Sequence, residues 1–120
     1  EYGFARRLGL PVATLQNQDG NYVKPGAESG RAALAAAAAD LPADLRLFIQ
    51  DAKGPESYPI VSLSWILLHD SYGDAAKAGA LREALNQGLT EGQSIAEEMG
   101  YIPLPEEIVA KASEAVAGIR

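Results

Sequence analysis

One apolar run in the middle of the 120-residue sequence sets the strongest constraint on the fold. It lies in SYPIVSLSWILLHD (Ser57–Asp70), where only two serines interrupt the apolar residues of Ile60–Leu68. A membrane-spanning helix needs about 20 apolar residues, so the run is too short to cross a bilayer. Its β-branched start disfavours a helix, and its uniformly apolar end disfavours a strand with one face in water. We therefore expect a strand buried on both faces, with Trp65 in the core.

The residues before this run predict two helices and a hairpin. Glu1–Leu8 is predicted to be a short helix, ended by Gly9 in the left-handed conformation. Val12–Gln16 alternates apolar and polar residues, which is typical of a strand with one exposed face. Asn17–Asn21 has the composition of a turn, and a second short strand is expected after it. The alanines of Glu28–Ala39 favour a helix.

Three helices are predicted after the run. Their ranges are about Asp74–Gln87, Thr90–Gly100 and Pro105–Ile119. In the second of these, TEGQ is a capping-box pattern, with Thr90 as the N-cap and Gln93 reaching back to it. The expected buried face of the third comprises Ile108, Val109, Ala112, Val116 and Ile119.

The predicted elements do not form a complete sheet. A strand that is buried on both faces normally lies in a sheet covered by helices on both sides, and the short hairpin cannot supply such a sheet. The sequence also opens, with EYGFARRLGLP, inside a helix that has no capping residue before it. We therefore expect an α/β fold of which this chain is a helix-rich, incomplete part.

The composition excludes several kinds of partner. The net charge of −6 and the pI near 4.7 oppose binding to nucleic acid or to an anionic membrane surface, because both need a cationic face. The sequence contains no cysteine, which excludes disulfides, thiolate catalysis and cysteine-based metal sites. Since no apolar segment reaches the length of a span, we also expect no direct membrane insertion.

The sequence predicts no catalytic or metal site. It lacks the nucleophile elbow, the phosphate-binding loop and the common zinc and calcium motifs. His69–Asp70 contains the single histidine of the chain, so we interpret it as a surface pair and not as a metal site. Glu97–Glu98 and Glu106–Glu107 are adjacent helical residues, which point about 100° apart and cannot flank one substrate. We therefore expect neither enzymatic activity nor a cofactor.

One stretch, PGAESGRAAL (Pro25–Leu34), is a weak candidate for an anion site. Ser29, Gly30 and Arg31 lie where a loop enters a helix, and helix N-termini bind phosphate through free N–H groups and the helix dipole. The guanidinium of Arg31 could hold a phosphate with two hydrogen bonds. Against this reading, Glu28 stands at the same point and repels an anion, and ordinary helix capping also explains the residues.

Three stretches, taken together, resemble one known family. They are EYGFARRLGLPVATLQNQDGNYVKP (Glu1–Pro25), YPIVSLSWILLH (Tyr58–His69) and GLTEGQSIAEEMGYIPLPEEIV (Gly88–Val109). In order and spacing they resemble the C-terminal portion of the periplasmic phosphate-binding protein of bacterial phosphate ABC transporters. The resemblance covers nearly the whole chain, and the second and third stretches carry its most specific motifs.

The resemblance implies a fold of two α/β lobes joined by a hinge, to which this chain contributes a segment that spans both lobes. Residues 1–56 then belong to the second lobe, and residues 57–70 form a strand that crosses between the lobes. Residues 71–120 contribute helices that pack on the first lobe. The hinge and structural positions of the crossing strand are Pro59, Ile60, Ser62, Ser64 and Trp65.

The resemblance also implies the function of the longer protein. Such a protein captures inorganic phosphate at the periplasm or cell surface and delivers it to the permease of an ABC importer. The family's phosphate-binding groups precede the matched region, so this segment is expected to be mainly scaffold and hinge. Two alternatives remain: a helical and β interaction module without a small-molecule ligand, and an enzyme with a related two-lobe fold, which is weaker because no nucleophile or metal set is found.

Overall fold

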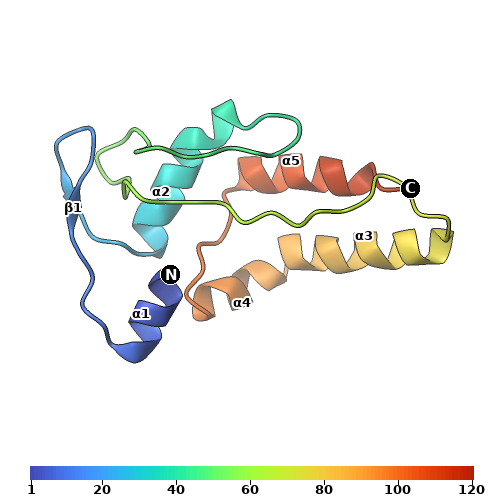
Figure 1. The fold of residues 1–120 in the computed structure, drawn as a ribbon, viewed down its shortest axis with the longest axis horizontal. Helices are drawn as coiled ribbons and strands as arrows, with labels where there is room; N and C mark the ends of the chain where they lie inside the picture. The colour runs from blue at the N-terminus through green and yellow to red at the C-terminus, as the bar shows by residue number, and fades with distance from the viewer.

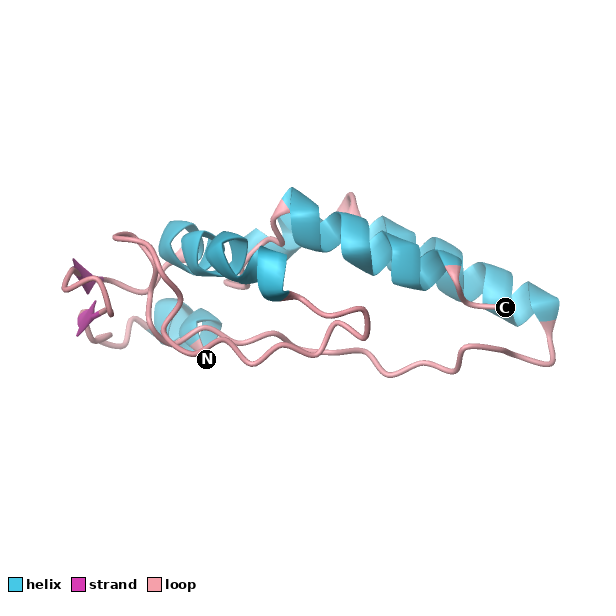
Figure 2. Ribbon diagram, turned by 90° about the horizontal axis from the view of Figure 1, so that it is seen from above, coloured by secondary structure: helices cyan, strands magenta, loops and turns pink.

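A computed structural model describes residues 1–120 as an elongated, helix-rich molecule of 50 × 32 × 18 Å (Figure 1). Most of the helices form one layer, and long extended segments of the chain run along one side of it (Figure 2). The elements are α1 (Tyr2–Leu8), β1 (Leu15–Gln16), β2 (Tyr22–Val23), α2 (Ala27–Ala37), the 3-10 turn η1 (Ala38–Asp40), α3 (Ala75–Leu89), α4 (Gly92–Glu98) and α5 (Glu106–Ala117). None of these helices combines the length and the apolar character that a bilayer crossing needs.

The N-terminal helix and the hairpin follow the predictions. Gly9 ends α1 with φ at 64°, and its N–H donates to the helix carbonyls. β1 and β2 pair antiparallel, with Leu15 opposite Val23. The strands have only two residues each, because Pro25, which lies two residues beyond Val23, has no N–H to extend the ladder.

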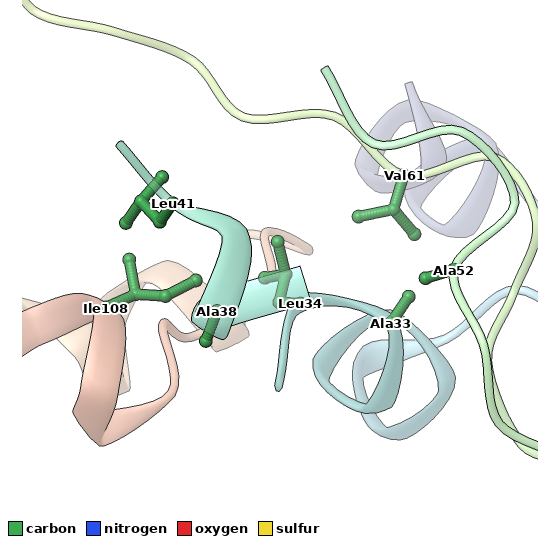
Figure 3. Close-up of a cluster of buried hydrophobic side chains, with 7 residues drawn as sticks. All are labelled: Ala33, Leu34, Ala38, Leu41, Ala52, Val61 and Ile108. Carbon is green, nitrogen blue, oxygen red and sulfur yellow. The ribbon is translucent and has the colours of Figure 1, made fainter. Parts of the chain in front are cut away.

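The Ala-rich helix α2 forms the centre of the main apolar cluster. Its small side chains let neighbouring segments approach closely, and Gly30 lies so near Ile102 that a Cβ at this position would overlap the isoleucine side chain. Figure 3 shows Leu41 and Ile108 facing each other, while Val61 points toward α2. The cluster comprises Ala33, Leu34, Ala38, Leu41, Ala52, Val61 and Ile108.

A second, smaller cluster joins α3 to the end of α5. The carboxylate of Asp74 caps α3 by accepting from the backbone N–H groups of Ala76 and Lys77. Ala78 of α3 packs with Val116 and Ile119, and Tyr72, Leu85 and Leu89 border this cluster. The predicted apolar face of the last helix is confirmed at Ile108, Val116 and Ile119, whereas Val109 and Ala112 are half-buried.

Lys111, in the middle of α5, links this helix to the end of α2 and η1. Its ammonium group donates to the carbonyl oxygens of Ala38, at 3.1 Å, and Leu41, at 2.9 Å. These carbonyls lie where the chain leaves α2 and η1. The carbonyl of Ala38 also accepts from the N–H of Leu41, whereas that of Leu41 has no backbone donor. Lys111 therefore caps the end of one helix from the side of another.

The predicted capping box at Thr90 and Gln93 is wrong. α3 continues to Leu89, so the Thr90 hydroxyl donates back to the carbonyl of Asn86 at 2.8 Å. The side-chain NH₂ group of Gln93 instead donates to the backbone carbonyl of Gly88. The side-chain oxygen of Gln93 accepts from the backbone N–H of Leu104. Thr90 thus belongs to the end of the preceding helix, which competes for the same hydroxyl.

The prediction of a strand buried on both faces is also wrong for these 120 residues. Ile60–Leu68 is extended but pairs with no other strand, and only Val61 is buried. Ile66 and Leu67 are 72% and 89% exposed, and Trp65, expected in the core, is 36% exposed. The physical reason is that the single hairpin of the chain lies elsewhere and is too short to pair with nine residues.

Candidate functional site

The five predicted hinge positions lie on one open stretch of backbone. The backbone N–H of Tyr58 donates to the backbone carbonyl of Ser29, and the backbone N–H of His69 donates to the hydroxyl of Tyr72. Both distances are 3.2 Å. Between these two points no N–H of Ile60–Leu68 has an acceptor. The segment is therefore held by hydrogen bonds at its ends and by side chains, and none of the backbone N–H groups of Ile60–Leu68 bonds within the chain.

Three side chains attach this stretch to the rest of the molecule. Val61 is buried in the main cluster, Leu63 packs against it, and Trp65 makes a hydrogen bond and a ring contact. The indole N–H of Trp65 donates to the carbonyl of Leu45 at 2.7 Å, and its ring meets that of Phe48 with centroids 5.5 Å apart. The hydroxyl of Ser62 only donates to the neighbouring carbonyl of Leu63. Ser64 is exposed and makes no hydrogen bond.

The N-terminal end of α2 opens on a groove of about 380 Å³. Its walls come from α1, the stretch before β1, the start of α2, the beginning of the apolar run and Ile102. The lining is mostly apolar, its one carboxylate is that of Glu1, and no lysine or arginine borders it. A phosphate needs hydrogen-bond donors or a cation, so the walls of this groove do not suit an anion.

The weak anion candidates at the same helix end are not brought together. The Ser29 hydroxyl donates to the carbonyls of Lys24, at 2.7 Å, and Gly26, at 3.3 Å, so its proton is already used. Gly30 is buried against Ile102, while Arg31 is exposed and does not line the groove. The structure thus shows an ordinary helix start at this place, with Gly26 as the N-cap and no side chain bonded to the first N–H groups.

Titratable side chains form no cluster that could carry chemistry. No group of three or more histidine and carboxylate side chains could hold a metal ion. His69 lies edge-on to the ring of Tyr72, with ring centroids 5.7 Å apart. The guanidinium of Arg46, 2.7 Å from Asp44, lowers the pKa of that carboxyl through hydrogen bonds, and both side chains are exposed on a loop.

A buried amide that the sequence analysis missed organises the hairpin end of the molecule. Asn17 is 4% exposed, and its NH₂ group donates to the carbonyls of Gly54, Pro55 and Ser57 at 3.0–3.3 Å. Its oxygen accepts from the backbone N–H groups of Asp19 and Asn21. The turn of the hairpin is therefore fastened to the loop that leads into the apolar run. Only the turn sequence NQDG signals this role, and it does not reveal the distant partners.

Comparison with known proteins places the chain beside ligand-binding proteins. The chain is similar to several curated phosphate-binding proteins PstS. The chain is 33% identical to the one from Pasteurella multocida over 92% of its length, and 35% identical to the one from Methanocaldococcus jannaschii over 100%. It is 33% identical to the one from Xylella fastidiosa over 91%. No protein-family model matches the chain.

These matches confirm the resemblance predicted from the sequence to a portion of the phosphate-binding proteins. The chain spans about a third of the length of the curated relatives it matches, with coverages of 32%, 34% and 30% in the three proteins named above. The helix-rich model with a small sheet agrees in part with the predicted fold class.

Proposed function

We propose that the chain is a segment of a substrate-binding protein that captures inorganic phosphate and delivers it to the permease of an ABC importer. The similarity to phosphate-binding proteins over nearly the whole chain carries this proposal. The proposed location of the longer protein is the periplasm or the cell surface. The proposed role is binding and delivery, without catalysis.

Within that protein, the segment acts as scaffold and hinge. Residues 1–56 belong to one lobe, residues 57–70 cross to the other, and residues 71–120 pack on the other lobe. Two observations support this division: the smaller apolar cluster of Ala78, Val116 and Ile119 lies wholly within residues 71–120, and no backbone N–H of Ile60–Leu68 in the crossing segment bonds within the chain. The main cluster takes Ile108 from residues 71–120, so the two parts also pack on each other within the chain. The groups that hold the phosphate come from outside these 120 residues, since no basic side chain lines the groove at the start of α2.

Calorimetric titration tests this proposal. We expect phosphate to produce no binding heat with the 120-residue chain. We expect specific binding, with a Kd of about a micromolar or tighter, in a hybrid protein in which the chain replaces the matched third of the Methanocaldococcus jannaschii relative. Sulfate serves as the control anion for both proteins.

Two results would contradict the proposal in different ways. A hybrid that folds but takes up no phosphate would remove the assignment of function. Specific binding by the chain alone would place a phosphate site within these residues, and Ser29, Gly30 and Arg31 would be the first positions to substitute. The unchanged relative, titrated in parallel, shows that the assay detects binding.

A further inference from the structure

The turn of the hairpin contains a residue pair that can react with itself. Asp19 is followed by Gly20, and it is the only aspartate of the chain that precedes a glycine. In such a pair the backbone nitrogen of the glycine can attack the side-chain carboxyl carbon of the aspartate, because the glycine has no side chain to hinder the approach. Both residues are exposed, so water reaches them.

The reaction is an isomerisation through a cyclic imide. A bond forms between the Gly20 nitrogen and Cγ of Asp19 in its protonated form, and the carboxyl hydroxyl leaves as water with the proton of that nitrogen. Water then adds to one of the two imide carbonyls. When it breaks the bond between the nitrogen and the original backbone carbonyl carbon, the chain continues through Cβ and Cγ, and the product is an isoaspartate. One water is released and one is consumed, so no other reactant is needed.

The fold keeps Asp19 and Gly20 out of the geometry that this attack requires. The N–H of Gly20 donates to the backbone carbonyl of Asn17 at 2.9 Å, which closes a four-residue turn. Asp19 has no positive φ, as in a type I turn. At this position of a type I turn ψ is about 0°, whereas ring closure needs the Gly20 nitrogen to eclipse Cβ of Asp19. The backbone must therefore leave the turn before the imide can form.

The carboxylate of Asp19 is held as well, by the loop that leads into the apolar run. Its Oδ2 accepts from the backbone N–H of Gly54, 35 positions along the chain, at 2.9 Å. The buried side chain of Asn17 donates to three carbonyls of the same loop, and the side chain of Gln18 donates to the carbonyl of Asp51. Three successive side chains of the turn therefore bond to residues 51–57, which lie beside the hairpin (Figure 1).

We infer that Asp19–Gly20 is a site of isoaspartate formation, and that the bonds from the hairpin turn to residues 51–57 suppress the reaction in the folded chain. Isomerisation lengthens the backbone between the two residues by a methylene group and removes the carboxylate from its place at Gly54. The hairpin then loses a connection to the loop before the apolar run. This inference does not depend on the proposed function, because it involves neither phosphate nor the rest of a longer protein.

Incubation of the folded chain at neutral pH tests the inference. Isoaspartate is quantified by labelled methyl transfer with an isoaspartyl methyltransferase and located by mass spectrometry. The peptide Leu15–Val23, which has the same turn sequence without the loop, is incubated in parallel. We expect isoaspartate at residue 19 in both, formed at least about tenfold more slowly in the chain. Asp19→Glu should abolish the signal in both. Absence of isoaspartate from the peptide, or equal rates in peptide and chain, would overturn the inference.

Two variants show whether the bonds to the loop suppress the reaction. Asn17→Ala removes the three buried donations and is expected to raise the rate in the chain at least about fivefold. Gln18→Ala, at an exposed position, removes only the bond to Asp51 and should raise the rate at least about twofold without threatening the fold. Each rate is divided by that of the peptide with the same substitution, so that direct effects of the sequence cancel.

A destabilised control separates the bonds of the turn from the stability of the whole chain. Gly100→Ala weakens the contact of α1 with the end of α4 and leaves the turn bonded, so it should not change the rate. All variants are compared under conditions in which circular dichroism shows them to be folded. Equal acceleration by Gly100→Ala and Gln18→Ala would attribute the suppression to global stability and overturn the inference. An unchanged rate in Gln18→Ala, with the turn still folded, would overturn it too.

Discussion

Replacement of Asn17 by aspartate is expected to lower the free energy of unfolding by about 3 kcal/mol or more. The substitution puts an oxygen where the amide NH₂ now donates to the carbonyls of Gly54, Pro55 and Ser57. Three acceptors would then face a fourth in a buried place, and the charged form could not be solvated. Urea unfolding of the chain, followed by circular dichroism, measures the loss.

Two further measurements make the Asn17 prediction specific. Asn86→Asp makes the same chemical change at an exposed position of α3 and should cost less than about 1 kcal/mol. The penalty of Asn17→Asp, taken relative to the unsubstituted chain, should shrink as the pH falls toward 4, because a protonated carboxyl can donate one hydrogen bond to the carbonyls. Equal costs for the two variants, or a penalty that grows in acid, would contradict the assigned role of Asn17.

Replacement of Gly100 by alanine is expected to cost about 3 kcal/mol, through two separate effects. Gly100 has φ at 88°, a backbone conformation that is strained for any residue with a Cβ. A Cβ there would also lie 2.6 Å from the Cα of Gly3, where α1 crosses the end of α4. The contact is with backbone, so no side chain can turn away to relieve it. The same urea measurement gives the loss of stability.

Other glycines of the chain separate the two effects. Gly9 has φ at 64° with nothing near its missing Cβ, so Gly9→Ala should show the conformational cost alone, about 1 kcal/mol. Gly73 has open space and no positive φ, so its replacement by alanine should cost nothing. If Gly100→Ala cost no more than Gly9→Ala, the close approach of α1 and α4 would have no energetic weight.

Local features of the fold were predictable because their causes lie within a few residues. Gly9 ends α1 and Asp74 begins α3, as the residue types indicate. The exception is Thr90, whose hydroxyl could serve the helix before it or the helix after it. The capping-box pattern considers only the helix that follows Thr90. It therefore could not predict that the Thr90 hydroxyl would donate to the carbonyl of Asn86 in the preceding helix.

Non-local features were not predictable in the same way. The apolar run Ile60–Leu68 predicts a strand that is buried on both faces, but the sequence of the run does not show which strands or helices would bury it. In the segment Leu45–Gln50, alternate side chains are half-buried and exposed, but the sequence hides this alternation because the exposed Phe48 is apolar. Asn17 is similar, since its three acceptors lie 37 to 40 residues away and are backbone carbonyls that no side-chain motif marks.

The single tryptophan of the chain, Trp65, lies in the segment Ile60–Leu68. Its ring is partly exposed, and its indole N–H donates to the backbone carbonyl of Leu45. Indole fluorescence moves to shorter wavelength when the ring loses contact with water. The colour of the emitted light therefore reports how completely this side of the molecule is covered, without any added label. Since the chain has no other tryptophan, the emission reports the surroundings of Trp65 alone. It does not report the unfolding of helices far from this residue.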